Sequence, residues 1–251
     1  MNLYYQSIFE LLYISTIAGL ATTAGCLIIL KLGNPTERVL SILLAGAGGV
    51  MLAITVLDLI PASLSLKQPI QFITGYTAGI LFIAIADRIL HATQKQIPTN
   101  RRNKLKRLGI LIASGIAIHD IPEGMVIAVG QEATGNIGML IAIGIALHNL
   151  PEGMATTTPL IMAGINKTKI LFLNLGIAIF TPIGAILGFF AMEKANASLA
   201  FFLALAGGAM SCLVFAQLWP LARENNPRFA LIGGTSGFII FFFISTFLPH
   251  I

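Results

Sequence analysis

The sequence contains few charged residues. Only 10% of its 251 residues are Asp, Glu, Lys or Arg, against 56% that are hydrophobic, whereas a soluble globular chain carries about 25% charged residues. This shortage excludes a soluble globular protein and indicates an integral membrane protein. Little sequence is left between the apolar stretches, so we expect residues 1–251 to form a single transmembrane domain.

Several familiar motifs are missing as well. The two cysteines, Cys26 and Cys212, lie within apolar stretches and have no metal-finger or CxxC spacing, so we interpret them as packing residues. No GxxxxGK[ST] sequence is present that would bind a nucleotide to drive transport. The net charge of +5 is concentrated in one segment, IPTNRRNKLKR, and is better explained by membrane topology than by nucleic-acid binding.

Hydropathy predicts an all-α membrane protein with eight spans, since a membrane helix needs about 20 predominantly apolar residues. The expected spans are Phe9 to Lys31, Val39 to Ile60, Phe72 to Leu90, Leu108 to Val129, Ile137 to Leu160, Ile170 to Met192, Leu199 to Leu221 and Ala230 to Leu248.

The basic residues predict the orientation, because loops rich in Lys and Arg stay in the cytoplasm. If the N-terminus lies outside, all Lys and Arg residues except Lys67 and Lys194 fall on the cytoplasmic side. We therefore expect a basic cytoplasmic loop at residues 91–107 and both termini outside the cytoplasm. The expected location is the plasma membrane, which is the inner membrane if the source is bacterial.

Two similar motifs place ionisable residues inside predicted spans. HDIPEG begins at residue 119 and HNLPEG at residue 148. A charge near the bilayer centre costs roughly 2.5–3.5 kcal/mol even on lenient scales, so a compensating interaction is required. The residues concerned are His119, Asp120, Glu123, His148, Asn149 and Glu152.

Helix geometry brings the polar residues of each motif to one side of its span, because positions i and i+4 are neighbours. If the two spans face each other, imidazoles and carboxylates converge on one point, and this ligand set suits Zn(II), Fe(II) or Mn(II). Pro122 and Pro151 remove backbone donors and favour a bend beside the cluster. The structural alternative is a polar patch that only holds two helices together.

An intramembrane metal-dependent hydrolase using the same ligands remains an alternative function. Such an enzyme needs a general acid or base in addition to its metal ligands. Asp120 is available for that role, although no HExxH motif occurs. A metal-gated channel or sensor would share the same site.

The paired motifs resemble the signature of the ZIP family of divalent metal transporters, especially its compact bacterial members. This resemblance covers essentially the whole chain. It implies that His119, Glu123, His148 and Glu152 bind a first metal ion, and that Asp120 and Asn149 join the glutamates at a second.

The resemblance also extends to two other spans. In the second span, Met51 and Asp58 match positions that line the entrance and approach the metal. In the sixth span, many relatives have a glutamate before the proline where this chain has Thr181, so the choice between a mononuclear and a binuclear site stays open.

An internal repeat favours transport independently of this resemblance. AGGVMLAITVLDLIP, from Ala47, aligns without gaps on AGGAMSCLVFAQLWP, from Ala206, and pairs Asp58 with Gln217. The two segments lie in spans of opposite direction, as expected for an inverted repeat of spans 1–3 and 6–8 around a central fourth and fifth span. We expect Gln217 to line the approach from outside.

The sequence therefore predicts zinc uptake into the cytoplasm by alternating access, by a protein that is not an enzyme and holds no prosthetic group. Fe, Mn, Cd and Co remain alternative substrates. The expected partners are the metal ion and the lipid bilayer, with no nucleic acid, and small residues in GYTAG offer a face for a homodimer. Proton coupling does not follow from the residues.

Overall fold

A computed structural model describes residues 2–33, 35–133 without 94–99, 135–195 and 198–247. Within these ranges the chain forms helices and no strand. The elements are α1 (Asn2–Leu32), α2 (Glu37–Ile54), the π-helix η1 (Thr55–Leu59), α3 (Ile60–Ser65), α4 (Pro69–Thr93), α5 (Arg101–Ala133), α6 (Gly135–Met162), α7 (Lys167–Ala178), α8 (Phe180–Ala195), α9 (Leu199–Leu213), the π-helix η2 (Val214–Leu218), α10 (Trp219–Asn225) and α11 (Pro227–Phe247).

Eight helical segments in the described residues are long and apolar enough to cross a membrane, which confirms the predicted number of spans. Each segment extends beyond the predicted span at one end or both, and the second, sixth and seventh combine two or more shorter elements. The largest difference is in the fourth span, which begins at Arg101 and not at Leu108, so the basic residues 101–107 form the first turns of α5. Of the expected loop, residues 94–99 lie outside the described part of the chain.

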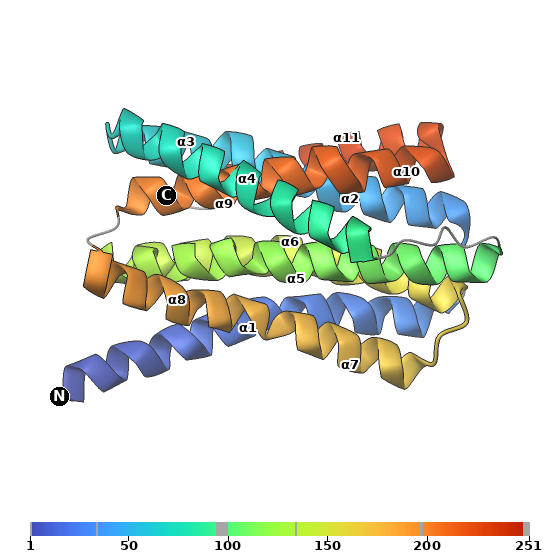
Figure 1. Ribbon diagram of the computed structural model, residues 1–251, viewed down its shortest axis with the longest axis horizontal. Coiled ribbons are helices and arrows are strands. Elements are labelled where there is room, and N and C mark those ends of the chain that lie inside the picture. Colours follow the sequence, from blue (N-terminus) through green and yellow to red (C-terminus); the bar gives the residue numbers. More distant parts are fainter. Residues whose placement is uncertain (1, 34, 94–99, 134, 196–197, 248–251) are drawn as a thin grey trace.

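The helices form two layers (Figure 1). One layer contains α1, α5, α6, α7 and α8, and the other contains α2, α3, α4, α9, α10 and α11. Contacts of α5 with α9 and of α2 with α6 join the layers. We call the end that carries Lys31, Arg101 and Arg223 the basic end, on the right in Figure 1, and the end that carries Lys67 the opposite end.

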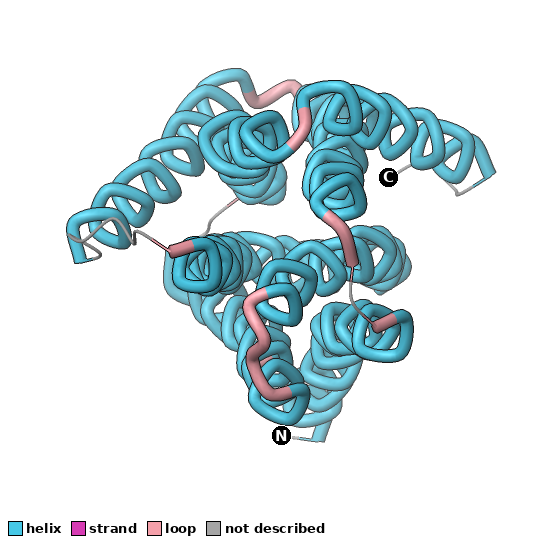
Figure 2. The backbone as a smooth tube through the Cα atoms, turned by 90° about the vertical axis from the view of Figure 1, so that its right-hand side faces the viewer, coloured by secondary structure: helices cyan, strands magenta, loops and turns pink. Residues whose placement is uncertain are grey.

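Figure 2 views the molecule along its helices. The helices α5 and α6 pack on each other and contact helices of both layers. Their inward faces contribute fully buried residues such as Ile112, Ile116 and Ile127 to one large core. Many large apolar side chains on the outer helices are exposed, among them Ile70, Phe172 and Leu231. An apolar exterior around a packed core is expected where lipid, and not water, surrounds the helices.

Three prolines mark irregularities that the hydropathy pattern does not reveal. Pro61 and Pro220 each lie two residues after the end of a π-helix. The residues between, Ile60 and Trp219, cap these helices and donate their N–H groups to carbonyls five residues earlier. The sixth span is interrupted between α7 and α8, three residues before Pro182. Since proline lacks an N–H and its ring displaces the preceding turn, each break follows from the sequence.

Matching glycines create close helix contacts in both halves of the chain. A Cβ atom at Gly49 on α2 would collide with the carbonyl oxygen of Gly234 on α11. At the aligned position on α9, a Cβ at Gly208 would collide with the carbonyl oxygen of Tyr76 on α4. The pair α2–α11 is therefore packed like the pair α9–α4, as expected if the second and third spans correspond to the seventh and eighth.

Candidate metal centre

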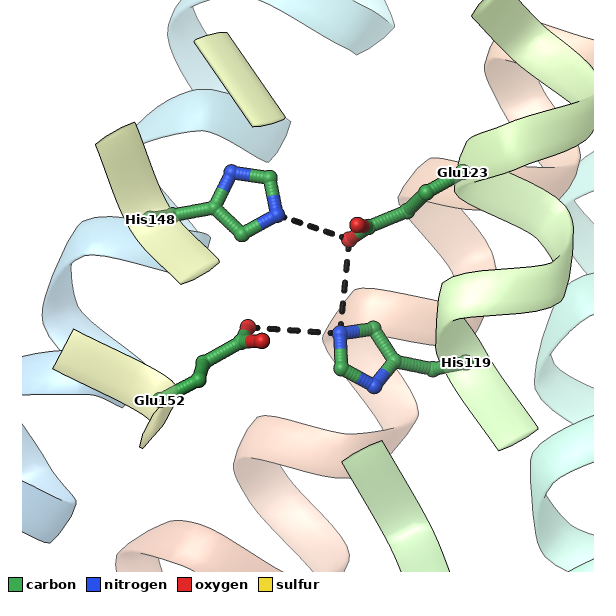
Figure 3. Close-up of side chains that lie close together, drawn as sticks. All are labelled: His119, Glu123, His148 and Glu152. Carbon is green, nitrogen blue, oxygen red and sulfur yellow. Dashed lines mark hydrogen bonds and ion pairs between the residues drawn. The ribbon is translucent and has the colours of Figure 1, made fainter. Parts of the chain in front are cut away.

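Four ionisable side chains meet between α5 and α6 (Figure 3). Nε2 of His148 lies 2.9 Å from Oε1 of Glu123, and Nε2 of His119 lies 3.3 Å from Oε1 of both Glu123 and Glu152. One ligand atom from each of the four residues falls within 4.8 Å of all the others. Because Zn(II) binds N and O ligands at about 2.0–2.2 Å, ligands on two sides of an ion lie up to about 4.4 Å apart, so small side-chain shifts would fit one ion.

Backbone carbonyls orient both imidazoles. Nδ1 of His119 lies 3.3 Å from the carbonyl oxygen of Gly115, and Nδ1 of His148 lies 3.0 Å from that of Gly144. In the tautomer with its proton on Nδ1, each ring donates to this carbonyl and directs the lone pair of Nε2 toward the centre. This is the usual way in which proteins hold a metal-binding histidine.

The centre is buried and rich in negative charge. His119 and Glu152 are fully shielded from solvent, and Glu123 and His148 nearly so. Neither carboxylate oxygen of Glu152, nor Oε2 of Glu123, makes a hydrogen bond to the described residues. Burying such groups unpaired is costly. A divalent cation arriving as substrate would neutralise the carboxylates and replace the missing hydrogen bonds, which the donor set allows.

Glycines beside the glutamates allow each motif to pack on another helix. A Cβ at Gly124 would collide with the carbonyl oxygen of Thr181 on α8, and one at Gly153 with that of Thr22 on α1. Two helices therefore support α5 and α6 from behind, at the level of the glutamates. The close packing holds the ligands in place. It requires glycine at both positions, because a larger residue would force the helices apart.

The residues that follow the histidines differ in their environment. The amide nitrogen of Asn149 donates to the carbonyl oxygen of Ala18 at 3.0 Å, and its Oδ1 makes no hydrogen bond within the described part of the chain. Oδ1 of Asp120 lies 3.7 Å from Nε2 of His119, and neither of its oxygens makes a hydrogen bond to the described residues. Asp120 precedes Gly124 by one turn, on the face of α5 that meets Thr181. The hydroxyl of Thr181 is also buried and makes no hydrogen bond to any residue that the structure describes.

Asp58 lies next to the centre, on the side of the opposite end. It lines a pocket of about 30 Å³ together with Glu123, His148, Gly144 and Met210. Met51 is fully buried in the core and is not among the lining residues of this pocket. Sequence reasoning missed Met210, although the repeat aligns it with Met51 and so offered a signal.

Gln217 does not lie where we expected it. Its Nε2 donates to Oδ1 of Asp87 at 2.6 Å, and its Oε1 lies against Gly115, one turn from His119 toward the basic end. If the basic end lies in the cytoplasm as predicted, Gln217 is on the cytoplasmic side of the centre, which does not agree with the expectation that it lines the external approach. The inverted repeat predicts this location, because the segments containing Asp58 and Gln217 run in opposite directions.

Comparison with known proteins agrees with this geometry. The family model of the ZIP zinc transporters matches residues 101–245. The zinc transporter ZupT of Streptococcus mutans is 30% identical over 94% of this chain and 96% of its own length. The protein of the same name from Enterobacter sp. (strain 638) is 32% identical and that from Salmonella newport 31%, each over 90% of this chain and 93% of its own length.

The chain therefore belongs to the ZIP family. Membership makes it a multi-pass membrane transporter of divalent metal ions and not an enzyme, so the alternative of an intramembrane hydrolase is not supported. The motifs that suggested the family, HDIPEG and HNLPEG, are the segments that build the buried cluster.

Proposed function

We propose that this protein carries zinc into the cytoplasm by alternating access. His119, Glu123, His148 and Glu152 bind the ion, and the observation that carries this proposal is the convergence of their ligand atoms inside an apolar bundle. A buried cation site between helices is expensive unless an ion occupies it. The zinc named for the related ZupT proteins makes zinc the first substrate to test.

The direction of transport rests on the orientation. Arg101, Arg102, Lys104 and Lys167 lie at the basic end, and the positive-inside rule favours the cytoplasm for that end. The ion then enters from the opposite end, where Asp58 and the small pocket lie beside Glu123 and His148. The same orientation puts both chain termini outside the cytoplasm, and we propose the plasma membrane as the location.

Alternating access is supported by the correspondence between the halves of the chain. Aligned segments both contain a π-helix, at Thr55–Leu59 and at Val214–Leu218. They also carry the matched glycine contacts of Gly49 and Gly208. An inverted repeat gives one chain two related conformations, in which the barrier at either side of a central site opens in turn.

A second ion at Asp120, Asn149 and Thr181 is weaker in this chain than in relatives with a glutamate at the last position. Of these three residues only Asp120 carries a charge, and a hydroxyl is a poorer ligand for a divalent cation than a carboxylate. We therefore propose that one ion is tightly bound, and that Asp120, Asn149, Thr181 and Asp58 line the path along which it moves.

Zinc influx into proteoliposomes that contain a zinc-sensitive dye tests the function. We expect saturable influx for the native chain and its loss in Glu123→Ala and Glu152→Ala, because each variant removes a ligand. Glu10→Ala, at an exposed position on α1, is the matched control and should keep native influx. Absence of influx through the folded native chain, or native influx in both ligand variants, would disprove the proposal.

A further inference from the structure

A large cavity opens at the basic end. Its volume is about 480 Å³, and it lies between the beginning of α5, the beginning of α2 and the helix α10. Charged residues line its mouth, including Arg101 and Glu37, which form an ion pair at 3.0 Å. Leu108, Leu111 and Leu221 line it as well.

One layer of side chains separates this cavity from the metal centre. Gly115 follows Leu111 by one turn of α5, and His119 follows Gly115 by another turn. On the facing segment, Gln217 precedes Leu221 by four residues. A Cβ at Gly115 would lie 2.5 Å from Oε1 of Gln217, so the amide occupies the place that a side chain at this position would need.

Asp87 holds the amide in this position. Nε2 of Gln217 donates to its Oδ1 at 2.6 Å, whereas Oε1 of Gln217 is buried and makes no hydrogen bond to the described residues. A charge-assisted hydrogen bond of this kind is short and comparatively strong. The end of the side chain that faces α5 is therefore a neutral amide oxygen, a weak ligand that would not retain a passing divalent cation.

The equivalent place on the other side of the centre is not filled in this way. Gly144 precedes His148 as Gly115 precedes His119, and Asp58 aligns with Gln217 in the repeat. Nothing lies within 4 Å of a Cβ placed at Gly144, and the pocket of about 30 Å³ occupies the space between Gly144 and Asp58. The two sides are thus built from corresponding parts, but only the side toward the basic end is filled.

We propose that Gln217, positioned by Asp87 and seated on the bare backbone of Gly115, is the barrier that closes the metal centre toward the basic end. The proposal rests on the proposed function, since a barrier matters only if an ion crosses. Opening toward the cytoplasm requires Gln217 to leave Gly115. The ion then passes from His119 into the cavity lined by Leu111 and Leu221.

Release of bound zinc to one side of a sealed vesicle tests the barrier. Protein carrying radioactive zinc is reconstituted with its basic end outward, the orientation being verified by protease treatment of a terminal tag, and an impermeant chelator is added outside. We expect Gln217→Ala and Gly115→Ala to lose zinc at least about tenfold faster than the native chain, a factor that corresponds to about 1.4 kcal/mol of barrier.

We expect the effect of Gly115→Ala to act through Gln217, because the added methyl group comes closest to the movable end of that side chain, at 2.5 Å, and lies 3.1 Å from Cδ1 of Leu213. In the Gln217→Ala background, Gly115→Ala should therefore add nothing further. Gly176→Ala, where a Cβ meets nothing within 4 Å, is the matched control and should leave release at the basic end unchanged. Gly144→Ala should slow zinc entry from the opposite end by filling the pocket there. Asp87→Ala should speed release, whereas Asp87→Asn, which keeps an acceptor oxygen, should retain most of the barrier.

Native release rates in Gln217→Ala and Gly115→Ala, with folding and zinc binding intact, would overturn the barrier while leaving the proposed function standing. Equal acceleration by Gly115→Ala with and without Gln217 would also overturn it. If Gln217→Ala does not fold, Gly115→Ala alone decides. Failure of the proposed function has a different signature, namely no saturable zinc influx in the native chain.

Discussion

The motifs of α5 and α6 share their histidine, proline, glutamate and glycine positions, but only one of them has an acidic residue after the histidine. In both, the histidine Nδ1 lies against the carbonyl four residues earlier, and the glycine after the glutamate packs on a neighbouring helix. At the residue after the histidine, α6 has Asn149, which is hydrogen-bonded to α1. At the same place α5 has Asp120, whose carboxylate makes no hydrogen bond to the described residues.

This difference separates residues that build the centre from a residue that adjusts its charge. The shared histidine, glutamate and glycine positions fix the ligands and the packing behind them. Asn149 uses its amide to attach α6 to α1, which is a structural task. Asp120 has no such attachment and adds a negative charge 3.7 Å from Nε2 of His119.

The largest expected effect compares the two glutamates. Oε1 of Glu123 lies within 3.3 Å of both histidines, whereas Oε1 of Glu152 lies at that distance from His119 alone. Glu123→Gln should therefore weaken zinc binding more than Glu152→Gln, by roughly 100-fold against about 10-fold. Isothermal titration of the purified protein with zinc measures both constants.

Equal losses in the two variants would mean that the ion, once bound, draws the glutamates into equivalent positions. The distances between the unliganded side chains would then not rank the ligands. Glu10→Gln serves as the control. It removes one exposed carboxylate near the beginning of α1, away from both motifs, and should leave zinc affinity unchanged.

The next effect concerns the packing glycines, for which the two helices should behave alike. Gly124→Ala and Gly153→Ala each introduce a methyl group into a backbone carbonyl of the neighbouring helix. Each should cost about 1–3 kcal/mol through overpacking, visible as a lower midpoint of thermal unfolding in detergent. Gly176→Ala, where a Cβ meets nothing within 4 Å, should cost nothing. A lower midpoint for only one motif variant would show that the motifs are supported differently.

Much of the fold could be predicted because one physical quantity governs it. Hydropathy locates every span, since each helix must bury its backbone in lipid. The ends of the helices and the interruptions within them were harder to predict from the sequence. Arg101–Arg107 continue α5 because a helix that leaves the membrane need not stop there, and the break before Pro182 follows from a single residue within an apolar run.

The metal centre could be predicted from the sequence for a similar reason, since charged residues inside spans are rare. The four clustered residues could be found from two short motifs, because spacing within one helix is fixed. Contacts between helices could not be predicted from the sequence. The hydrogen bond of Gln217 with Asp87 joins residues 130 positions apart, and the position of Met210 at the pocket depends on how α9 packs on α5.

The smallest expected effect tests the position at which the two motifs differ in charge. Asp120→Asn gives HDIPEG the same polar residues as HNLPEG and removes a charge 3.7 Å from His119. The loss of zinc affinity should be under about tenfold, because the direct ligands remain and a neighbouring charge acts through a partly screened field. Asn149→Asp is the reciprocal variant, and its main effect should be on stability, since a carboxylate cannot donate to the carbonyl of Ala18. Zinc titration together with thermal unfolding distinguishes the two outcomes. If Asp120→Asn abolishes zinc binding, Asp120 is a direct ligand, and the difference between the motifs lies within the metal's own coordination shell.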